Sequence, residues 1–490
     1  MESPLNSKSI LQHLSKPSVA LCLLASSAAI TSAQQAPGGL HGQNIPISSR
    51  DRVYLSDQTS NTVSVIDPST NKLLGVIRLG DDTPGNLSPL YKGQLLVHGM
   101  GLSPDHKTLD VVSIGSNSVT FIDTATNAIC HVSYVGRAPH EAMFTQDGRE
   151  VWVTVRGEDY VQVLDGKTFE PITRITVPNG PGMTIFSPDG KYGYVVSSFV
   201  PEAVVIDVRS HKVVGHVKQT SPFSPDLAAT PDGKQVWFTL KDTGKTQVIN
   251  AQPPFNTLAV LDTGPITNHV NIVRNSHGQF AYVTVGGLNA IKVFTTTEHP
   301  ELVATIPTGE LPHGLWPSGD GKRIYVGLEN GDSVAAVDTE TNKVMAVIPS
   351  GQSPQGMVYI PNAVPTGDGL QNLIPLGESG EAIHITLSSV RSGKQETTVT
   401  INNQGLIDLL EAAVTGLEPK TGYVLLLSER PDGSGKREPL AKFMTNPAGA
   451  AIVTALGPLR SIVKSDKSDS KRYLLITKAG EDQPVVQTQH

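Results

Sequence analysis

The chain has 490 residues, of which 17% are charged, and its formal net charge is −7. This length predicts more than one folded unit, and the absence of a basic excess argues against nucleic acid as a partner. Glycine (46) and proline (35) are frequent. Because Val, Ile and Thr are abundant as well, we interpret them as turn residues between many strands and not as signs of disorder.

The first 33 residues are predicted to be an export signal. Lys8 and Lys16 precede an apolar run at 19–30, and small residues precede Gln34, as signal-peptidase cleavage requires. The apolar run is too short to span a membrane, and no later stretch is apolar enough. The mature chain is therefore predicted to be secreted or periplasmic, without a transmembrane span. A retained N-terminal anchor is the alternative.

After a polar leader at 34–50, one sequence unit recurs along the chain. In residues 136–175 it contains a Pro-His turn, a short apolar run, a four-residue turn, and the alternating strands VWVTV and VQVLD. The four-residue turns start at Ser103, Thr145, Ser187, Thr230, Asn275 and Ser318, 42 to 45 residues apart. A period near 40 with short strands of alternating polarity is typical of a β-propeller blade.

The two ends of the repeat region complement each other. The first copy, from Arg52, lacks an innermost strand, whereas residues 351–360 match a blade-opening segment that has no outer strands after it. We therefore predict that 351–360 is the innermost strand of the first blade, which closes the ring without a free sheet edge. Strands of the VxVID type predict seven blades; they begin at Val63, Val119, Val161, Ala203, Thr246, Ala290 and Ser333.

A second domain is predicted after the repeats. Residues 362–380 are rich in Pro and Gly and indicate a linker. Alternating segments within 381–490 predict a small β-sandwich, and residues 406–414 suit either a strand or a short helix. The predicted fold class is thus all-β: a seven-bladed propeller at 51–361, closed by its C-terminal inner strand and followed by a β-sandwich.

The acidic residues between the outer strands are predicted to be structural. Residues 67–71, 123–127 and 338–342 are the same hairpin written three times, each beginning with Asp and ending with Asn. The Asp can accept backbone N–H bonds, and the Asn tolerates a left-handed conformation. We therefore do not interpret these residues as catalytic pairs.

Two further positions depart from the repeat. Residues 81–96 are an insertion between the first two blades, which we expect as a loop on the binding face, beside the Pro-His turns. Cys130 is the only cysteine outside the signal segment, so no intrachain disulfide is expected in the mature chain. We predict that Cys130 is a small buried residue on a strand.

The repeats resemble the YVTN-family β-propellers. The segments that carry the resemblance are Tyr282–Val285 (YVTV), Ser187–Gly190 (SPDG), Val337–Lys343 (VDTETNK) and Gly309–Gly314 (GELPHG). It covers about residues 51–361 and implies the fold, but such propellers include surface proteins, periplasmic binders, lactonase-like hydrolases and relatives of the haem d1 domain of nitrite reductase. Residues 416–423 are similar to the Ig-like domain of some anti-sigma factors.

The candidate site lies where the Pro-His turns meet at the mouth of the propeller channel. Aligning this position around the ring gives His98, His140, Gly182, Asp226, His269, His313 and Gln355. Converging neutral imidazoles can bind a divalent transition metal, for which the predicted ligands are His140, His269 and His313. Glu141 and Asp226 can add oxygen ligands.

The loops between the middle strands are expected to bring charged residues to the rim of the same mouth. These are Arg156, Glu158, Asp159, Glu202, Lys241, Asp242, Lys245, Glu329 and Asp332. The predicted ligand-binding set comprises His98, His140, Glu141, Arg156, Asp226, His269 and His313. The structural alternative is that each His caps backbone groups of its own blade without any ligand.

Two functions remain open at this point. The first is a secreted or periplasmic binding protein whose propeller face holds a protein, a cell-envelope component or a small molecule, because the sequence shows a scaffold without a catalytic signature. The alternative is a metal- or cofactor-dependent enzyme, either a lactonase-like hydrolase or a redox module, with its site at the channel mouth. The resemblance implies His140 and His313 as axial ligands of a haem-d1-type site, and a divalent ion is the cofactor expected for hydrolysis.

Overall fold

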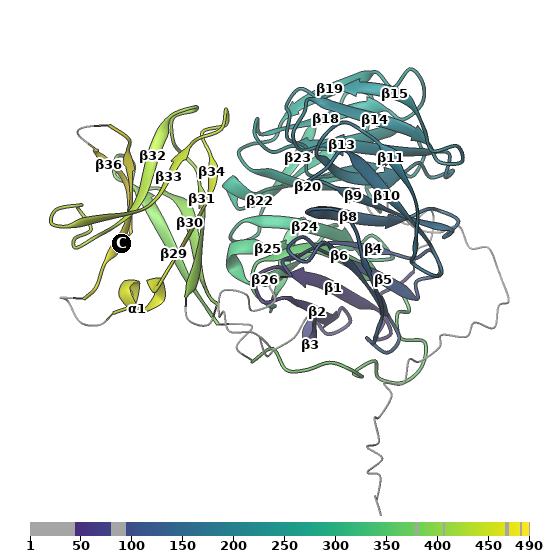
Figure 1. Cartoon of the computed structure of the whole chain (residues 1–490), viewed down its shortest axis with the longest axis horizontal. Helices are drawn as coiled ribbons and strands as arrows, with labels where there is room; N and C mark the ends of the chain where they lie inside the picture. The colour runs from purple at the N-terminus through teal and green to yellow at the C-terminus, as the bar shows by residue number, and fades with distance from the viewer. Residues whose placement is uncertain are drawn as a thin grey trace, which may run out of the picture. The chain divides into compact units, whose positions relative to one another are not determined.

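The computed structural model describes residues 45–79, 95–377, 381–404, 407–465, 470–480 and 483–489. Strands dominate this part of the chain (Figure 1). The predicted export signal, most of the leader and nearly all of the insertion at 81–96 lie outside the described residues. None of the helices within these ranges is long and apolar enough to cross a membrane.

Residues 52–360 form seven four-stranded antiparallel sheets, each one blade of a propeller. From the inner to the outer strand, the first four blades are β28 (Pro354–Ile360), β1 (Arg52–Asp57), β2 (Thr62–Asp67), β3 (Lys72–Arg78); β4 (Val97–Leu102), β5 (Thr108–Ser113), β6 (Ser118–Asp123), β7 (Ile129–Tyr134); β8 (Pro139–Phe144), β9 (Glu150–Val155), β10 (Tyr160–Asp165), β11 (Pro171–Thr176); and β12 (Pro181–Phe186), β13 (Tyr192–Ser197), β14 (Glu202–Asp207), β15 (Lys212–Lys218). The last three blades are β16 (Leu227–Ala229), β17 (Gln235–Leu240), β18 (Lys245–Asn250), β19 (Thr257–Asp262); β20 (Thr267–Asn275), β21 (Gly278–Val285), β22 (Ala290–Thr295), β23 (Leu302–Pro307); and β24 (Pro312–Pro317), β25 (Arg323–Leu328), β26 (Ser333–Asp338), β27 (Lys343–Pro349).

The ring closes as the sequence predicts. β28, from the end of the repeat region, pairs antiparallel with β1, with Val53 opposite Tyr359. The first blade therefore contains strands from both ends of the repeat region, and its hydrogen bonds hold the ring shut. Seven blades and closure by the last inner strand are both confirmed.

Burial along each blade explains the sequence pattern. β9 alternates Val with Trp or Thr, and almost all of its side chains are buried, because each face of a blade packs on its neighbour. On the outer strand β11 only Ile175 is buried, so this strand is half solvated. The short helices η2 (Gly286–Leu288) and η3 (Glu329–Gly331) lie between second and third strands.

The outer hairpins have the predicted roles. Asp67 Oδ1 accepts the Ser69 backbone N–H at 2.8 Å, and Asn71 has a φ of 53°. The Asn has a second role that the sequence did not reveal, because Tyr325 of the adjacent blade donates its hydroxyl to Asn71 Oδ1 at 3.0 Å. The same tyrosine–asparagine contact joins Tyr54 to Asn127 at 3.2 Å.

The prediction for Cys130 is wrong. Cys130 lies on the outer strand β7 and is exposed. The outermost strand has no further blade to cover it, so small apolar residues there face solvent. Its thiol lies 3.6 Å from the Ala128 carbonyl oxygen.

The second β domain is an eight-stranded antiparallel sheet folded into a nearly closed sandwich. Its strands, in the order of the sheet, are β33 (Arg437–Met444), β32 (Gly422–Ser428), β35 (Tyr473–Lys478), β36 (Val485–Gln489), β29 (Ala382–Ser389), β30 (Gln395–Asn403), β31 (Asp408–Val414) and β34 (Ala451–Gly457), with the short helix α1 (Leu459–Val463). The edge strands β33 and β34 contact each other. Residues 406–414 suited either a strand or a short helix from the sequence, and 408–414 of them form the strand β31. Leu387, Leu425 and Ile476 belong to its own hydrophobic core.

Candidate functional site

In six of the seven blades a register shift interrupts the pairing of the inner strand, so two consecutive residues can face the channel. In β8 the shift lies between Pro139 and Ala142, and in β20 between Thr267 and Val270. Without the shift, neighbouring side chains would point to opposite faces. The channel wall therefore has two tiers, an upper one at the position of His140 and a lower one at the position of Glu141.

In three blades, the hydroxyl of a threonine on the second strand lies close to backbone carbonyl oxygens of both tiers. Thr154 Oγ1 lies 3.2 Å from the Glu141 carbonyl oxygen of its own blade and 2.9 Å from the Gly182 carbonyl oxygen of the next blade. The corresponding acceptors are Asp226 and Asn268 for Thr239, and His269 and His313 for Thr284. Each hydroxyl joins the lower tier of one blade to the upper tier of the next.

This pattern corrects the predicted ring alignment. Asp226 and His269 belong to the lower tier with Glu141, whereas His98, His140, His313, Gly182 and Gln355 belong to the upper tier. Asn268 occupies the upper position in the blade of His269. β20 is longer than the other inner strands, so its upper position, Asn268, lies seven residues before the turn at Asn275, whereas His140 lies five residues before the turn at Thr145.

The four predicted histidines nevertheless come together across the channel. Their ring centroids are 4.3 Å apart for His98 and His140, 6.0 Å for His98 and His313, and 4.5 Å for His269 and His313. All four are buried, with at most 8% of their surface exposed. Rings this close and this buried form one cluster. Two of them also meet backbone groups, as the structural alternative expects, because His140 Nδ1 lies 2.7 Å from the Gly182 carbonyl oxygen and His313 Nδ1 lies 3.3 Å from the Gln355 carbonyl oxygen.

The imidazoles of this cluster are neutral. Burial lowers the pKa of His98, His140 and His313 well below the usual value, and it lowers the pKa of His269 to about 3. His140 Nδ1 lies 2.7 Å from the Gly182 carbonyl oxygen, which only accepts, so Nδ1 carries the proton and Nε2 keeps its lone pair. Nδ1 of His98 and Nε2 of His269 have no hydrogen-bond partner among the described residues.

Two buried carboxyl groups lie beside these rings. Glu141 Oε1 is 3.7 Å from His98 Nδ1, and Asp226 Oδ1 is 3.4 Å from His269 Nδ1. Burial raises the pKa of both carboxyl groups well above the usual value. Glu141 has room because residue 99 is glycine, and a Cβ there would clash with Glu141 Oε2.

One set of donors is compact enough for a single ion. Ligand atoms of His98, His140 and Glu141 all lie within 4.8 Å of one another, and no other such group occurs in the part of the chain that the structure describes. Neutral imidazole and carboxylate suit zinc, copper or iron. The group shares only His140 with the predicted metal ligands, since His269 and His313 lie farther along the cluster.

The predicted rim residues divide into two sets. Arg156 and Lys241 are partly buried near the histidines, and desolvation lowers the pKa of each, opposed by Glu141 for Arg156 and by Glu329 for Lys241. Glu329 also accepts the Gln355 amide at 2.6 Å.

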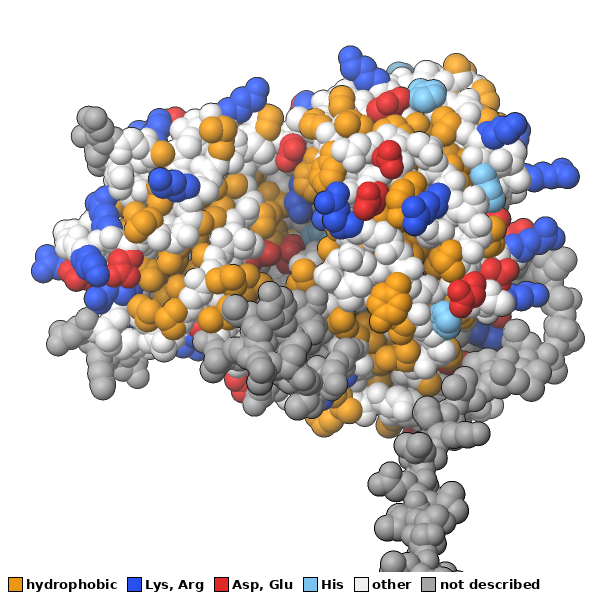
Figure 2. All heavy atoms as spheres, in the orientation of Figure 1, with side chains coloured by type: hydrophobic (Ala, Val, Ile, Leu, Met, Phe, Trp, Pro, Cys, Tyr) orange, Lys and Arg blue, Asp and Glu red, His pale blue; other side chains and the backbone are white. Residues whose placement is uncertain are grey.

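Three other predicted rim charges pair with side chains outside the histidine cluster. Glu202 pairs with His216 at 2.7 Å, and Lys245 pairs with Asp262 at 2.5 Å, both on neighbouring outer strands. Arg137 and Glu158 lie 3.9 Å apart with largely exposed side chains. The surface in Figure 2 likewise shows positive and negative side chains interspersed.

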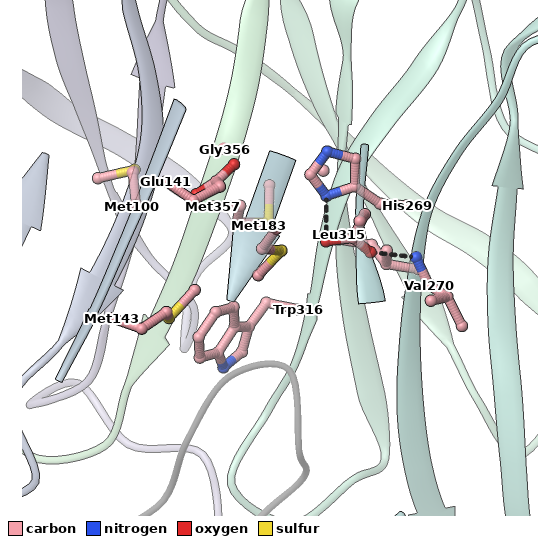
Figure 3. A pocket seen from close by; sticks show the side chains of 12 residues that line it. Met100, Glu141, Met143, Met183, His269, Val270, Leu315, Trp316, Gly356 and Met357 are labelled. Atoms are coloured by element: carbon pink, nitrogen blue, oxygen red, sulfur yellow. Dashed lines mark hydrogen bonds and ion pairs between the residues drawn. The ribbon is translucent and has the colours of Figure 1, made fainter. Parts of the chain in front are cut away.

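A cavity below the upper tier was not predicted from the sequence. Four methionines line it, Met100, Met143, Met183 and Met357, together with Glu141, Asp226, His269 and Trp316 (Figure 3). Its volume of about 20 Å³ admits a single water molecule or ion. Each methionine lies one to three residues after the upper-tier residue of its inner strand. Only an alignment of the blades could therefore have predicted from the sequence that the four come together.

Comparisons with known proteins agree with this fold. The family model described as "Lactonase, 7-bladed beta-propeller" matches residues 132–357. No curated protein matches the chain.

Among solved structures, a protein of unknown function from Desulfotomaculum acetoxidans has a TM-score of 0.54 and 13% identity over 63% of this chain and 98% of its own. Kuenenia stuttgartiensis hydrazine synthase has a TM-score of 0.51 and 20% identity over 64% of this chain and 99% of that chain. At these identities the likeness shows the fold alone. The chain contains a seven-bladed β-propeller, as the repeats led us to expect, and part of this propeller is similar to the lactonase model.

Proposed function

We propose that the protein is a metal-dependent hydrolase that opens a small lactone, a cyclic ester, at the histidine cluster of the propeller channel. The compact donor group of His98, His140 and Glu141 carries this proposal. The family model supports it, because lactonases are enzymes. Both favour the enzymatic alternative over the binding protein that the sequence suggested first.

The types of donor atom suit a divalent transition metal, and the tautomer of His140 leaves a ring nitrogen available to bind it. The proton of His140 is held at Nδ1 by the Gly182 carbonyl, which leaves Nε2 free to bind. His98 Nδ1 is buried without a hydrogen-bond partner among the described residues and lies beside Glu141. A buried polar atom without a partner is costly, and a metal ion would remove that cost.

The surrounding charges suit ester hydrolysis. Attack on an ester carbonyl places negative charge on its oxygen, and cations fixed beside the site stabilise that charge. Arg156 and Lys241 are the cations near the cluster, and both are partly removed from water, which weakens the screening of their charge. A divalent ion supplies the remaining chemistry, since it polarises the carbonyl and lowers the pKa of a bound water.

The proposal is tested on the chain from Gln34 onwards, purified without chelator. We expect a stoichiometric transition metal by elemental analysis and hydrolysis of small lactones by a pH-stat assay. The double substitution His98→Ala/His140→Ala should remove the metal and lower kcat/KM at least about 100-fold, because polarisation by an ion contributes several kcal/mol.

The matched control is His216→Ala, which removes an exposed imidazole from an outer strand. It should leave both metal content and hydrolysis unchanged. Hydrolysis that persists without metal would overturn the metal-dependent mechanism, and a metal-loaded protein that opens no lactone would overturn the substrate class.

We further propose that the protein is exported and works outside the cytoplasm. The basic residues, the apolar run and the small residues before Gln34 support this. N-terminal sequencing of the secreted or periplasmic protein should begin at Gln34. The predicted domain boundaries at 33, 50, 361 and 380 remain predictions that limited proteolysis can test.

A further inference from the structure

Methionine is concentrated in the channel of this protein. The chain contains seven methionines, and four of them line one cavity. Met100, Met143, Met183 and Met357 come from four different inner strands, and each is at most 4% exposed. Figure 3 shows their side chains gathered around the cavity. Side chains that carry thioethers, from four different strands, therefore line one cavity.

An imidazole joins these thioethers. His269 lines the same cavity, and its Nε2 is buried without a hydrogen-bond partner among the described residues. Its Nδ1 lies 3.4 Å from Asp226 Oδ1, and Asp226 is held in place because its Oδ2 accepts the Val270 backbone N–H at 2.6 Å. A carboxylate that orients a histidine from behind is a common arrangement at metal sites.

The size of the cavity limits what it can hold. About 20 Å³ is room for one ion or one water molecule and excludes an organic substrate. A water molecule needs several hydrogen-bond partners, but thioether sulfur is only a weak acceptor. The four thioethers are thus poorly matched to water and well matched to a soft cation, whereas Glu141, Asp226 and His269 of the same lining can bond either.

We propose that this cavity is a Cu(I) site formed by the methionine thioethers and His269. Soft sulfur ligands select Cu(I) over hard divalent ions, and imidazole suits copper as well. The carboxyl groups of Glu141 and Asp226 line the same cavity. The site adjoins the proposed divalent site of His98, His140 and Glu141 and shares only Glu141 with it, whereas its methionines and His269 are its own.

The test is an anaerobic titration of the chain from Gln34 with Cu(I) against a colorimetric Cu(I) chelator. We expect one tightly bound Cu(I) per chain and sulfur ligation by X-ray absorption. The triple substitution Met100→Leu/Met183→Leu/Met357→Leu should weaken Cu(I) binding at least about tenfold. Leucine keeps the volume and apolar character of methionine, so the fold should survive.

The control substitutes the two methionines that lie outside the channel. Met345 and Met444 are 49% and 68% exposed, and Met345→Leu/Met444→Leu should bind Cu(I) like the wild type. A wild type that binds no Cu(I), or a triple variant that binds it equally well, would overturn the proposal. The methionines would then only fill the channel, as flexible side chains often do.

The two proposed metal sites can be separated by the same variants. The methionine triple variant should retain the divalent metal and any lactone hydrolysis, whereas His98→Ala/His140→Ala should retain Cu(I) binding. Failure of one proposal therefore leaves the result for the other intact.

Discussion

Carboxyl groups at the outer hairpins and in the channel come from the same repeat but meet opposite environments. In the outer hairpin of the fourth blade, Asp207 is close to solvent and accepts the Ser210 backbone N–H at 2.9 Å, and these hydrogen bonds lower its pKa. In the channel, Glu141 and Asp226 are buried, and desolvation raises the pKa of each. The outer carboxylate is satisfied by its own turn. The inner groups lie beside two imidazoles, His98 and His269, each of which has one ring nitrogen without a hydrogen-bond partner among the described residues.

The difference separates structural from functional acids. A hairpin Asp finds its donors within three residues, so its role is complete without a ligand. A channel carboxyl depends on neighbouring blades for its partners, so an incoming ion can compete for it. Three substitutions test this distinction, beginning with the one expected to have the largest effect.

The first concerns Asp57, a buried carboxyl at the C-terminal end of β1. Its Oδ2 accepts hydrogen bonds from Thr62 and Ser64, each at 2.8 Å, while Oδ1 is buried without a partner among the described residues. Burial raises the pKa of Asp57 to about 8. The protonated form is therefore favoured in the folded state, relative to a pKa near 3.9 in the unfolded chain.

The contribution of protonated Asp57 to the free energy of unfolding should be fully present below about pH 4 and should be lost as the pH rises towards 8. At about 1.4 kcal/mol per pKa unit the loss can reach several kcal/mol. Urea denaturation between pH 4 and 8 measures it, and Asp57→Asn should flatten the slope, because the amide is neutral throughout. Equal slopes for wild type and variant would show that Asp57 is ionised in the folded protein.

Asp226 gives the second test, because its carboxyl group accepts the Val270 backbone N–H and lies beside the His269 ring. Asp226→Ala leaves the Val270 N–H without its acceptor at 2.6 Å and removes the group beside His269. A buried unsatisfied donor costs about 1–3 kcal/mol, so we expect a loss of that size in the free energy of unfolding. Asp226→Asn keeps an acceptor and matches a neutral carboxyl, so it should cost less than half as much. An Asn variant as unstable as the Ala variant would contradict the neutral state.

The sequence predicts the blades well because their signals are local. The Asp–Asn hairpins and the turn tetrads are set by residues within five positions of one another, and the missing strands at the two ends complement each other. The tier of a channel residue is not local, since it depends on a register shift between strands. Asp226 and His269 were therefore aligned with the wrong tier. The methionine cavity was missed because its four members come from four blades.

Asp207 provides the third and mildest test, on the outer side of the comparison. Asp207→Ala removes the acceptor of the Ser210 N–H at 2.9 Å and of the Ser210 hydroxyl at 2.6 Å. Both donors lie at the surface and can turn to water, so the loss in the free energy of unfolding should be about 0.5–1.5 kcal/mol. The lowered pKa of Asp207 means that this contribution is present above about pH 4 and is lost as the pH falls further. The urea midpoints of the two proteins should therefore converge in acid, opposite to the trend at Asp57. A gap that widens in acid would mean that the hairpin carboxylate is not stabilised in its charged form, and the contrast between the two ends of the blade would fail.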